Sequence, residues 1–510
     1  MKQYYLGIEF GSTRVKAVLI DGEHRIVKSG DYTWKSSLEN GVWTYHMEDV
    51  QTGLRTAIRN LGELPGAVSA MGISGMMHGY LAFDKDWNLL APFRTWQNTM
   101  TGEAAEQLTA EFGFNIPQRW SIAHLYQAVL NGEAHVKNIA HITTLAGYVH
   151  YLLTGENVLG VGEASGMFPI DSEALDYDAA MLEKFDALIA KYGFAWTARS
   201  VLPKVLTAGQ AAGALTQAGS TFLDGLLSAG IPFCPPEGDA GTGMTATNAV
   251  APRTGNVSAG TSIFAMVVLE KPLSKVYQEI DMVTTPSGKP VAMVHCNNCT
   301  NDMNAWVSLL GETAKLFGAE VSTGELFTKL YQKSLEGDAD CSGVLTYNYM
   351  AGEGITHLDE GRPMVVRKPE SSFTLANFLR SQLYATMSTL KLGMDILAEE
   401  HVAIDSLTGH GGLFKTPVVG QKYMAAACRA SVTCMESAGE GGPYGMALLA
   451  SYLVQKKDGQ TLEQYLETEV FADVKRTTLA PDPEDEAGFD RYLSWYRSAL
   501  AAENAAVKAF

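Results

Sequence analysis

The chain has 510 residues, of which 46% are hydrophobic and 18% are charged, and its formal net charge is −18 at pH 7. This length exceeds what a single hydrophobic core supports, which predicts two large domains. The negative charge argues against a nucleic-acid-binding protein, whose surface is normally basic. No stretch has the roughly 18 uninterrupted apolar residues of a membrane helix, the N-terminus lacks a signal-peptide layout, and the six cysteines are too few for a disulfide framework. We therefore expect a globular, cytoplasmic protein with neither a nucleic acid nor a membrane as partner.

The N-terminal half opens with apolar runs that predict three antiparallel strands over residues 4–34, with Asp21 and Gly22 at the second turn. The same reading predicts the elements that follow: a helix over 47–61, strands over 67–74 and 80–83, a turn over 84–88 and several helices between 101 and 195. The loop over 75–79 joins two of these strands and contains Met77 and His78. Side chains on such a loop can face a ligand.

The second half repeats the alternation of strands and helices. A β-rich block begins near Gly230, where an apolar strand over 231–235 leads to Asp239, which we expect between Gly238 and a turn over 241–243. The segment 249–255 contains Pro and Gly and is the predicted boundary between domains 1–250 and 251–510. The later elements are helices over 302–335 and 374–401, a strand over 406–412 ending in glycines, a helix over 417–429, and a helical tail from 461 with a solvated acidic connection at 481–486. Alternation in both halves predicts an α/β architecture that is built twice.

One sequence device occurs once in each half. Residues 6–20 consist of two apolar runs around a Gly-Ser-Thr turn at 11–13, and residues 255–269 repeat this around a Gly-Thr-Ser turn at 260–262. Each copy predicts a β-hairpin whose turn gathers backbone N–H groups and hydroxyls, which suits phosphate oxygens. An ordinary hairpin turn is the alternative for either copy alone. The presence of two copies indicates two domains that grip opposite sides of a polyphosphate.

Few single side chains stand out as candidates for catalysis or ligand binding. Asp239 is flanked by glycines that let a ligand approach the backbone, although an aspartate beside glycines is more often a turn residue. His78 follows a strand, with a structural histidine as the alternative. Cys296 and Cys299 have the spacing of zinc ligands, but no second Cys/His pair stands at the right distance. Walker A, dinucleotide-binding and Ser/His/Asp patterns are absent from the sequence.

The order of several short motifs resembles the FGGY carbohydrate kinases of the actin/hexokinase/heat-shock ATPase superfamily, closest to the xylulokinase branch. The matching motifs are the first phosphate motif at 7–13 with Lys16, the sugar-contacting motif at 73–79, stretches at 148–156 and 163–166, the catalytic Gly238-Asp239 pair, the second phosphate motif at 260–262, the adenosine motif at Gly411 and Gly412 with Lys415 and Gln421, and a small-residue helix at 444–447.

This resemblance implies two ribonuclease-H-like domains with an active-site cleft between them, the substrates ATP and a small sugar, and Mg²⁺ as cofactor. Asp239 would accept or orient the hydroxyl proton of the sugar, and the two glycine-hydroxyl turns would bracket the phosphates. By role, the implied residues are Asp239 for catalysis; Met77, His78, Gly79, Trp96, Asn98 and Asp239 for sugar binding; Gly11, Ser12, Thr13, Arg14, Lys16, Gly260, Thr261, Ser262, Gly411, Gly412 and Lys415 for ATP binding; and Glu9 and Asp239 for the metal.

Three positions depart from the family pattern. Glu9 stands where the first motif usually has aspartate, Ala240 stands where an amide residue usually follows the catalytic aspartate, and residues 96–100 read Trp-Gln-Asn-Thr-Met in place of Trp-x-Asp-x-Arg. The first bears on Mg²⁺ geometry and the others on sugar contacts. D-xylulose is therefore the first candidate substrate, with L-ribulose, another ketose or a polyol as alternatives, and a non-catalytic ATP-dependent switch as the rival function. Whether the chain forms a homodimer is left open.

Overall fold

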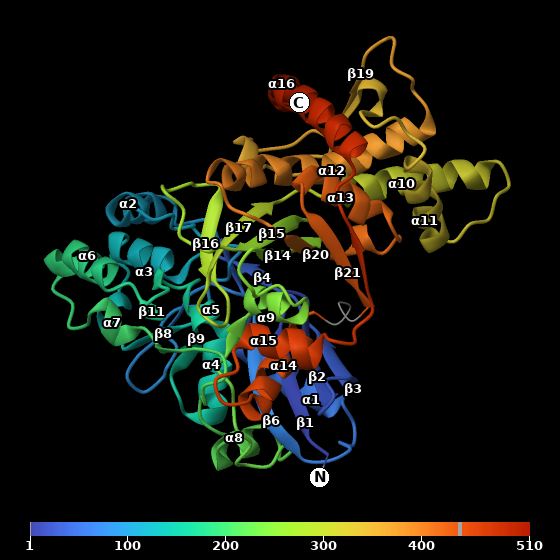
Figure 1. Cartoon of the computed structure of the whole chain (residues 1–510). Helices are drawn as coiled ribbons and strands as arrows, with labels where there is room; N and C mark the ends of the chain where they lie inside the picture. Colours follow the sequence, from blue (N-terminus) through green and yellow to red (C-terminus); the bar gives the residue numbers. More distant parts are fainter. Residues whose placement is uncertain (1, 437–440, 510) are drawn as a thin grey trace. The chain divides into compact units, whose positions relative to one another are not determined.

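The computed structural model describes residues 2–436 and 441–509, which fall into two compact units (Figure 1). The first contains residues 2–252, 268–291 and 441–474, and the second contains residues 253–267, 292–436 and 475–509. Two late segments thus cluster with the first unit. The predicted division into domains 1–250 and 251–510 stays a prediction.

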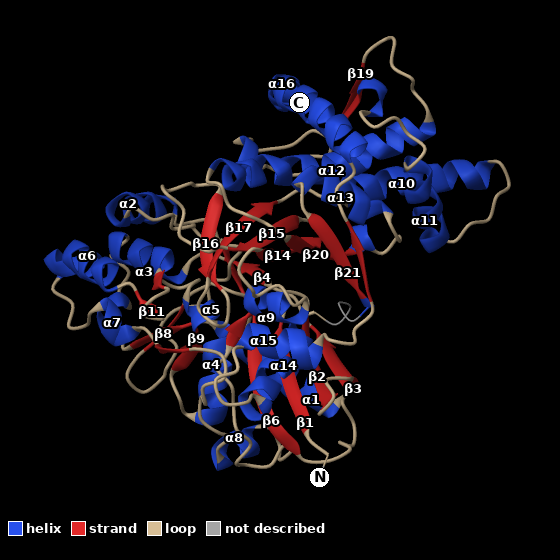
Figure 2. Cartoon of the chain, viewed as in Figure 1, coloured by secondary structure: helices blue, strands red, loops and turns tan. Residues whose placement is uncertain are grey.

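The first unit is built on a five-stranded sheet in the order β13-β6-β1-β2-β3. The predicted meander is confirmed: β1 pairs with β2 and β2 with β3, both antiparallel. β6 and β13 continue the sheet in parallel with β1. Apolar side chains of β1, β2 and β6 are almost fully buried, because helices cover this sheet (Figure 2). The five strands are β1 (Tyr4–Phe10), β2 (Arg14–Asp21), β3 (Ile26–Thr33), β6 (Val68–Gly75) and β13 (Glu237–Gly238).

A helix from far along the chain packs on this sheet. α14 (Gly442–Gln455) lies beside β1 and β6, so red-orange ribbon adjoins blue strands in Figure 1. The approach is close: a Cβ added at Gly7 would lie 2.0 Å from the carbonyl oxygen of Pro443. The other helices of the first unit are α1 (Met47–Arg59), α2 (Gly102–Phe112), α3 (Ser121–Leu130), α4 (Leu145–Thr154), α5 (Val161–Ala164), α6 (Ala179–Ile189), α7 (Ala198–Val201), α8 (Gln217–Phe222), α9 (Asp239–Ala246) and α15 (Leu462–Tyr465).

Short strands complete the first unit. They are β4 (Ser37–Glu39) with β5 (Val42–Thr44), β7 (Leu81–Phe83) with β8 (His141–Thr143), β9 (Val158–Gly160) with β12 (Lys204–Leu206), β10 (Ile170–Asp171) with β11 (Asp176–Tyr177), and β16 (Ile280–Thr284). The helix expected over 47–61, the strands over 67–74 and 80–83, and the helices between 101 and 195 are confirmed.

The second unit repeats the arrangement, with strands in the order β17-β15-β14-β20-β21-β22. β14 and β15 form an antiparallel hairpin, as β1 and β2 do, and β20 and β21 continue in parallel with β14, as β6 and β13 do with β1. The prediction of an α/β architecture built twice is therefore confirmed. These strands are β14 (Thr254–Ala259), β15 (Ile263–Val268), β17 (Pro290–Cys296), β20 (Ser406–Gly411), β21 (Ser431–Met435) and β22 (Arg476–Leu479), with a separate pair β18 (Val344–Tyr347) and β19 (Met364–Arg367).

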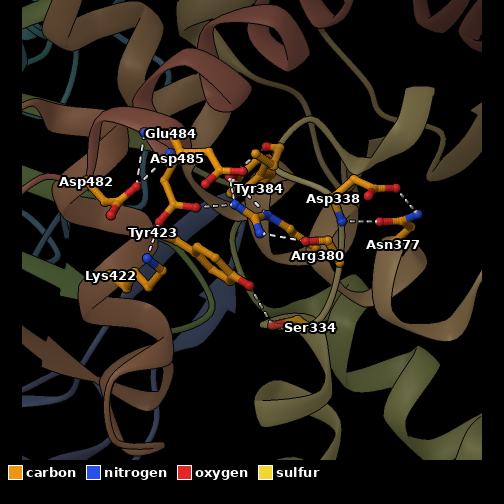
Figure 3. Close-up of polar contacts among 12 residues, drawn as sticks. Ser334, Asp338, Asn377, Arg380, Tyr384, Lys422, Tyr423, Asp482, Glu484 and Asp485 are labelled. Atoms are coloured by element: carbon orange, nitrogen blue, oxygen red, sulfur yellow. Dashed lines mark hydrogen bonds and ion pairs between the residues drawn. The ribbon is translucent and has the colours of Figure 1, made fainter.

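The helices of the second unit agree with the sequence prediction, but the tail predicted as helical from 461 contains the strand β22 over 476–479 and also differs at residues 481–486. They are α10 (Asn301–Leu316), α11 (Thr323–Ser334), α12 (Leu375–Glu399), α13 (Val419–Cys428) and α16 (Pro483–Ala509). The acidic segment 481–486 is not a solvated connection, because α16 begins within it and Asp485 is buried. Figure 3 shows why: Asp485 points at Arg380 of α12 and Lys422 of α13. Two cations from distant helices thus balance the charge of a buried carboxylate, although its neighbours in the sequence are charged.

Within the ranges that the structure describes, every helix is too short or too polar to cross a membrane.

Candidate active site

Three adjacent parallel strands of the first unit end at the same edge of the sheet. Phe10 of β1 pairs with Gly75 of β6, and Gly75 pairs with Gly238 of β13. The residues at or just beyond these strand ends are therefore neighbours: Glu9, the loop with Met77 and His78, and Asp239. Ligands of α/β sheets commonly bind beyond the carboxyl ends of parallel strands.

Asp239 is the first residue of α9, directly after β13. Its Oδ1 accepts hydrogen bonds from the backbone N–H groups of Met77 (3.3 Å) and Ala240 (3.0 Å). The side chain is exposed to solvent, yet nearby protein atoms partly desolvate it and raise its pKa, which the two amides and the charge of Arg119 oppose. A reachable carboxylate with a raised pKa is suited to accept a proton.

Two predictions around Asp239 are wrong. Residues 241–243 do not form a turn but continue α9, where the Thr242 hydroxyl donates to the carbonyl oxygen of Gly238 (3.1 Å). The strand expected over 231–235 is reduced to isolated bridges at Pro232 and Phe233, and the strand itself is β13. Packing accounts for one glycine of α9, because a Cβ at Gly241 would lie 3.2 Å from Cγ of Pro286.

His78 is held by its ring and its backbone. Its Nδ1 lies 3.0 Å from the carbonyl oxygen of Gly166, and its ring stacks on Trp120 with centroids 6.1 Å apart. Burial, aided by the charge of Arg119, lowers the pKa of His78 to about 3, so the imidazole is neutral. The φ angle of 69° puts His78 in the left-handed region, where strained residues gather at functional sites. Gly79 follows with a φ of 84°.

Glu9 points one carboxylate oxygen into the protein. Oε2 is buried and has no hydrogen-bond partner among the described residues. A Cβ added at Gly442 would lie 1.4 Å from this oxygen, so the start of α14 closes over it. Desolvation and the charge of Asp239 raise the pKa of Glu9 to about 8, which the charge of Lys16, its β2 neighbour, opposes. An orphaned carboxylate oxygen near a second carboxylate matches the oxygen ligands that Mg²⁺ prefers, with phosphate and water completing the shell. Within residues 2–436 and 441–509, no cluster of three or more protein side chains could hold a metal alone.

The first glycine-hydroxyl turn is held in place by hydrogen bonds. The N–H of Gly11 donates to the carbonyl oxygen of Arg14 (2.9 Å), the Trp34 indole donates to the carbonyl oxygen of Gly11 (2.7 Å), and the Tyr45 hydroxyl donates to that of Ser12 (2.7 Å). The side chains of Ser12, Thr13 and Arg14 are exposed. The carbonyl oxygens of Gly11 and Ser12 are thus engaged within the protein, which leaves the exposed hydroxyls of Ser12 and Thr13 available to a phosphate.

The segment after the sugar motif is partly structural. Trp96 is 38% exposed and available to a ligand. Asn98 is buried; its amide nitrogen donates to the carbonyl oxygens of Trp43 (2.8 Å) and Thr95 (3.0 Å), and its oxygen accepts from the N–H of Trp43 (2.8 Å). Its amide hydrogens are thus already used to hold the strand that contains Trp43. A sugar contact by Asn98 stays a prediction.

In the second unit, the other two predicted glycine motifs meet at one sheet edge. Ala259 of β14 pairs with Gly411 of β20, so the turn at 260–262 lies beside Gly411 and Gly412. A Cβ at Gly411 would lie 2.4 Å from the carbonyl oxygen of Ala259, and its φ is 97°, so glycine is required. Lys415 is exposed just beyond.

The second turn is anchored like the first. The Thr300 hydroxyl donates to the carbonyl oxygen of Gly260 (2.7 Å), and the N–H of Cys299 donates to that of Thr261 (3.0 Å). Thr261 is exposed and Ser262 half-buried. Cys299 and Cys296 are both buried, and burial raises the pKa of both thiols. Gln421, by contrast, is tied to the carbonyl oxygens of Val432 and Thr477, both at 2.7 Å.

Three charged residues near Asp239 carry no role in the sequence prediction. Glu237 is buried and accepts from the N–H groups of Glu163 (2.9 Å) and Gly162 (3.4 Å), and burial raises its pKa to about 8. Glu163 is also buried, with its pKa raised well above the usual value by burial, and a Cβ at Gly238 would lie 2.4 Å from its Oε2. Arg119 forms an ion pair with Asp281. Glu163 belongs to the motif at 163–166, but no local pattern indicates a chemical role for any of the three residues, since their neighbours come from distant segments.

The comparisons with known proteins agree along nearly the whole chain. Residues 4–245 match the N-terminal domain of the FGGY family of carbohydrate kinases, and residues 255–454 match the C-terminal domain. The chain is 22% identical over 461 residues to xylulose kinase of Haemophilus influenzae, covering 86% of this chain and 89% of that one. It is 27% identical over 291 residues to glycerol kinase of Thermococcus kodakarensis, covering 53% and 54%.

Solved structures share the fold at low identity. A structure titled as a xyloylose kinase from Brucella ovis has a TM-score of 0.79 at 19% identity, covering 98% of this chain and 99% of that one. A gluconate kinase from Lactobacillus acidophilus has a TM-score of 0.80 at 16% identity, covering 99% of both.

Proposed function

Since this chain belongs to the FGGY family of carbohydrate kinases, we propose that it transfers the γ-phosphoryl group of ATP to a hydroxyl of a ketopentose, D-xylulose first, giving D-xylulose 5-phosphate. The xylulose kinases among its relatives and the Met77-His78-Gly79 loop support this choice. L-ribulose, other ketoses and polyols are the alternatives, and the glycerol and gluconate kinases among the similar proteins keep them in the test.

The placement of Asp239 carries the proposal. Its carboxylate stands beside the loop of Met77 and His78, is reachable from solvent and has a raised pKa. A sugar hydroxyl is a poor nucleophile, and in-line attack needs its proton removed or its oxygen oriented. In the step, a bond forms between the sugar oxygen and the γ-phosphorus, the bond from the γ-phosphorus to the bridging oxygen breaks, ADP leaves, and Asp239 takes the hydroxyl proton. Such assistance contributes about 10²–10⁴-fold to the rate.

We propose that domains 1–250 and 251–510 divide the remaining tasks. The first supplies Met77, His78, Gly79, Trp96 and Asn98 toward the sugar and a phosphate turn formed by Gly11, Ser12, Thr13 and Arg14, with Lys16 behind it. The second supplies the phosphate turn at 260–262, and Gly411, Gly412 and Lys415 toward the adenosine. The anchoring of both turns through their carbonyl oxygens supports this division, because it leaves the hydroxyls to the ligand.

Glu9 and Asp239 are the residues proposed to hold Mg²⁺. The metal, when bound, neutralises charge on the phosphate oxygens. The unpartnered Oε2 of Glu9 supports this assignment. Its side chain is one methylene longer than that of aspartate, and the close start of α14 at Gly442 limits where the carboxylate can point. The homodimer, the cytoplasmic location and the cleft between domains stay predictions.

A coupled assay of ADP release against pentuloses, hexuloses, aldonates and polyols tests the proposal. We expect ADP release to accelerate with a pentulose and phosphate to appear on the sugar. ADP release that no sugar accelerates would instead indicate a nucleotide-driven switch, and acceleration by a polyol or an aldonate alone would move the substrate class.

A further inference from the structure

Arg119 lies against the loop that contains His78. The N–H of Gly79 donates to the carbonyl oxygen of Arg119 (3.2 Å), and the hydroxyl of Ser121 donates back to the carbonyl oxygen of Gly79. Between these two bonds, the ring of Trp120 stacks on His78. Segments 78–79 and 119–121 are therefore joined side by side.

The guanidinium of Arg119 is anchored at one end only. It forms an ion pair with Asp281 of β16, and Asp281 also accepts from the Asn115 amide (3.3 Å), which donates to the carbonyl oxygen of Ile280 as well (2.9 Å). The Asp281 side chain is 11% exposed, whereas that of Arg119 is 26% exposed. No other hydrogen bond of this guanidinium occurs in the described part of the chain, so its remaining N–H groups are left to donate to a ligand.

The charge of Arg119 also acts on Asp239, the proposed base. Its positive charge lowers the pKa of both His78 and Asp239, as expected of a cation on the segment that is hydrogen-bonded to Gly79. Because Asp281 balances this charge, the site presents a directed set of donors rather than an uncompensated cation.

His78 offers a hydrogen-bond acceptor that complements the donors of Arg119. A carbonyl oxygen only accepts, so Nδ1 of His78 carries the proton that is donated to Gly166, and in a neutral imidazole Nε2 is then a pure acceptor. Nε2 has no hydrogen-bond partner among the described residues, and His78 as a whole is 5% exposed. The two hydrogen-bonded segments thus carry an acceptor-only group on His78 and a donor-only group on Arg119.

From this juxtaposition we infer that Arg119 is a specificity-determining residue, whose guanidinium binds the carbonyl oxygen of an open-chain ketose while Nε2 of His78 accepts from the adjacent hydroxyl. A ketone oxygen only accepts and the neighbouring hydroxyl donates, which is the complement of the two protein groups. A polyol, which has a hydroxyl in place of the ketone, fits this pair less well. The inference rests on the proposed function for the identity of the site and adds the residue that recognises the ketone.

Binding measured without ATP tests the inference apart from the kinase reaction. Isothermal titration calorimetry compares a pentulose with the pentitol made by reducing its carbonyl. The wild-type protein should bind the pentulose more tightly, and Arg119→Gln should weaken pentulose binding about 10- to 150-fold, the range for losing a charge-assisted hydrogen bond. Pentitol binding should change much less. Arg119→Lys, which keeps the charge without the planar fork, should fall in between.

Asp281 is a positioning residue in this account. Asp281→Asn should raise the KM for the pentulose without changing kcat or the KM for ATP, and the double variant with Arg119→Gln should be no worse than Arg119→Gln alone. Arg199→Gln is the matched control, since Arg199 pairs with Asp176 at 2.8 Å on a half-exposed surface; it should leave both sugars unaffected.

An Arg119→Gln protein that binds ATP normally and still prefers the pentulose to the pentitol by the wild-type ratio would overturn the inference. So would a wild-type protein that shows no such preference. A wild-type protein that binds the pentulose through Arg119 but does not phosphorylate it would contradict the proposed function alone.

Discussion

The backbone N–H of Met77 donates to Oδ1 of Asp239 over 3.3 Å and ties the first residue of α9 to the loop after β6. The N–H of Ala240 donates to the same oxygen over 3.0 Å. Because both amides converge on Oδ1, we expect Oδ2 to be the oxygen that a substrate hydroxyl contacts. This hydrogen bond thus fixes the position of the proposed base relative to the loop that is proposed to bind the sugar.

The anchoring of the first turn predicts a selective effect on ATP. Tyr45→Phe removes the hydrogen bond to the carbonyl oxygen of Ser12 and loosens the turn, so the KM for ATP should rise about 3- to 10-fold, as expected for one net hydrogen bond. Steady-state kinetics with varied ATP and varied sugar measure this. Tyr126→Phe, which loses a hydrogen bond to Gln107 elsewhere in the first unit, is the control. An equal effect of both variants, or a change in the sugar KM alone, would contradict the assignment of this turn to phosphate.

The contact between β1 and α14 predicts a large loss of stability from one methyl group. Gly7→Ala would place Cβ 2.0 Å from the carbonyl oxygen of Pro443 and 2.5 Å from the backbone nitrogen of Ala447. Backbone atoms on both sides cannot rotate away, so the free energy of unfolding should fall by about 3 kcal/mol, the upper part of the usual range for overpacking.

Gly243→Ala is the matched control, because its added Cβ meets nothing within 4 Å and lies inside α9. It should be neutral or stabilising by up to about 1 kcal/mol. Urea denaturation of both variants measures the difference. Equal stabilities of the two variants would show that α14 does not pack on β1 as described.

The buried Asp485 predicts a local weakness in the second unit. Asp485→Asn leaves Arg380, whose side chain is 4% exposed, without its counter-charge, and such a change typically costs about 3–5 kcal/mol. Hydrogen exchange of α16 should accelerate accordingly. Asp490→Asn breaks the exposed pair with Arg429 and should cost less than about 1 kcal/mol. Similar exchange rates in the two variants would mean that the pair in Figure 3 does not hold α16.

The buried histidines predict an acid-sensitive first unit, and His150 is the simplest to test. Burial lowers the pKa of His150 to about 4, while its Nε2 donates to the carbonyl oxygen of Ala212 over 2.8 Å. Between pH 6.5 and 4 the unfolded chain binds a proton at this residue and the folded chain does not, so stability falls as the pH falls.

His150→Gln keeps a donor toward Ala212 but cannot be protonated. Relative to this variant, the wild-type free energy of unfolding should drop by up to about 3 kcal/mol between pH 6.5 and pH 4. Denaturation curves at several pH values measure the difference. A difference that stays constant over this range would show that His150 is not buried in its neutral form.

Local patterns were enough to predict most elements. The hairpins around residues 11–13 and 260–262 are visible in the sequence because turn and flanking strands are contiguous, and the same holds for α1 and α12. The pairing of Ala259 with Gly411 is beyond such patterns, since about 150 residues separate them. It follows only once the second unit is recognised as a copy of the first.

The errors have one physical origin. Residues 241–243 and 481–486 have turn and loop compositions, but tertiary contacts decide their structure. α9 forms beneath α14, where a Cβ at Gly445 would lie 1.9 Å from the carbonyl oxygen of Thr242, and the first turn of α16 contains Asp485, which two distant cations neutralise. The sequence prediction gives no role to Arg119, and includes Glu163 only as part of the motif at 163–166, because the chemistry of both residues depends on neighbours that packing supplies.

Replacement of Asp239 tests the central claim most directly. In a coupled assay with ATP and a pentulose, Asp239→Asn should fold as the wild type, bind ATP with similar affinity and lose about 10²–10⁴-fold in kcat. Asp224→Asn, which changes an aspartate that is half exposed and pairs with Arg59, should retain full activity. A near-wild-type rate of sugar phosphorylation by Asp239→Asn would contradict the assignment of the base and with it the proposed mechanism.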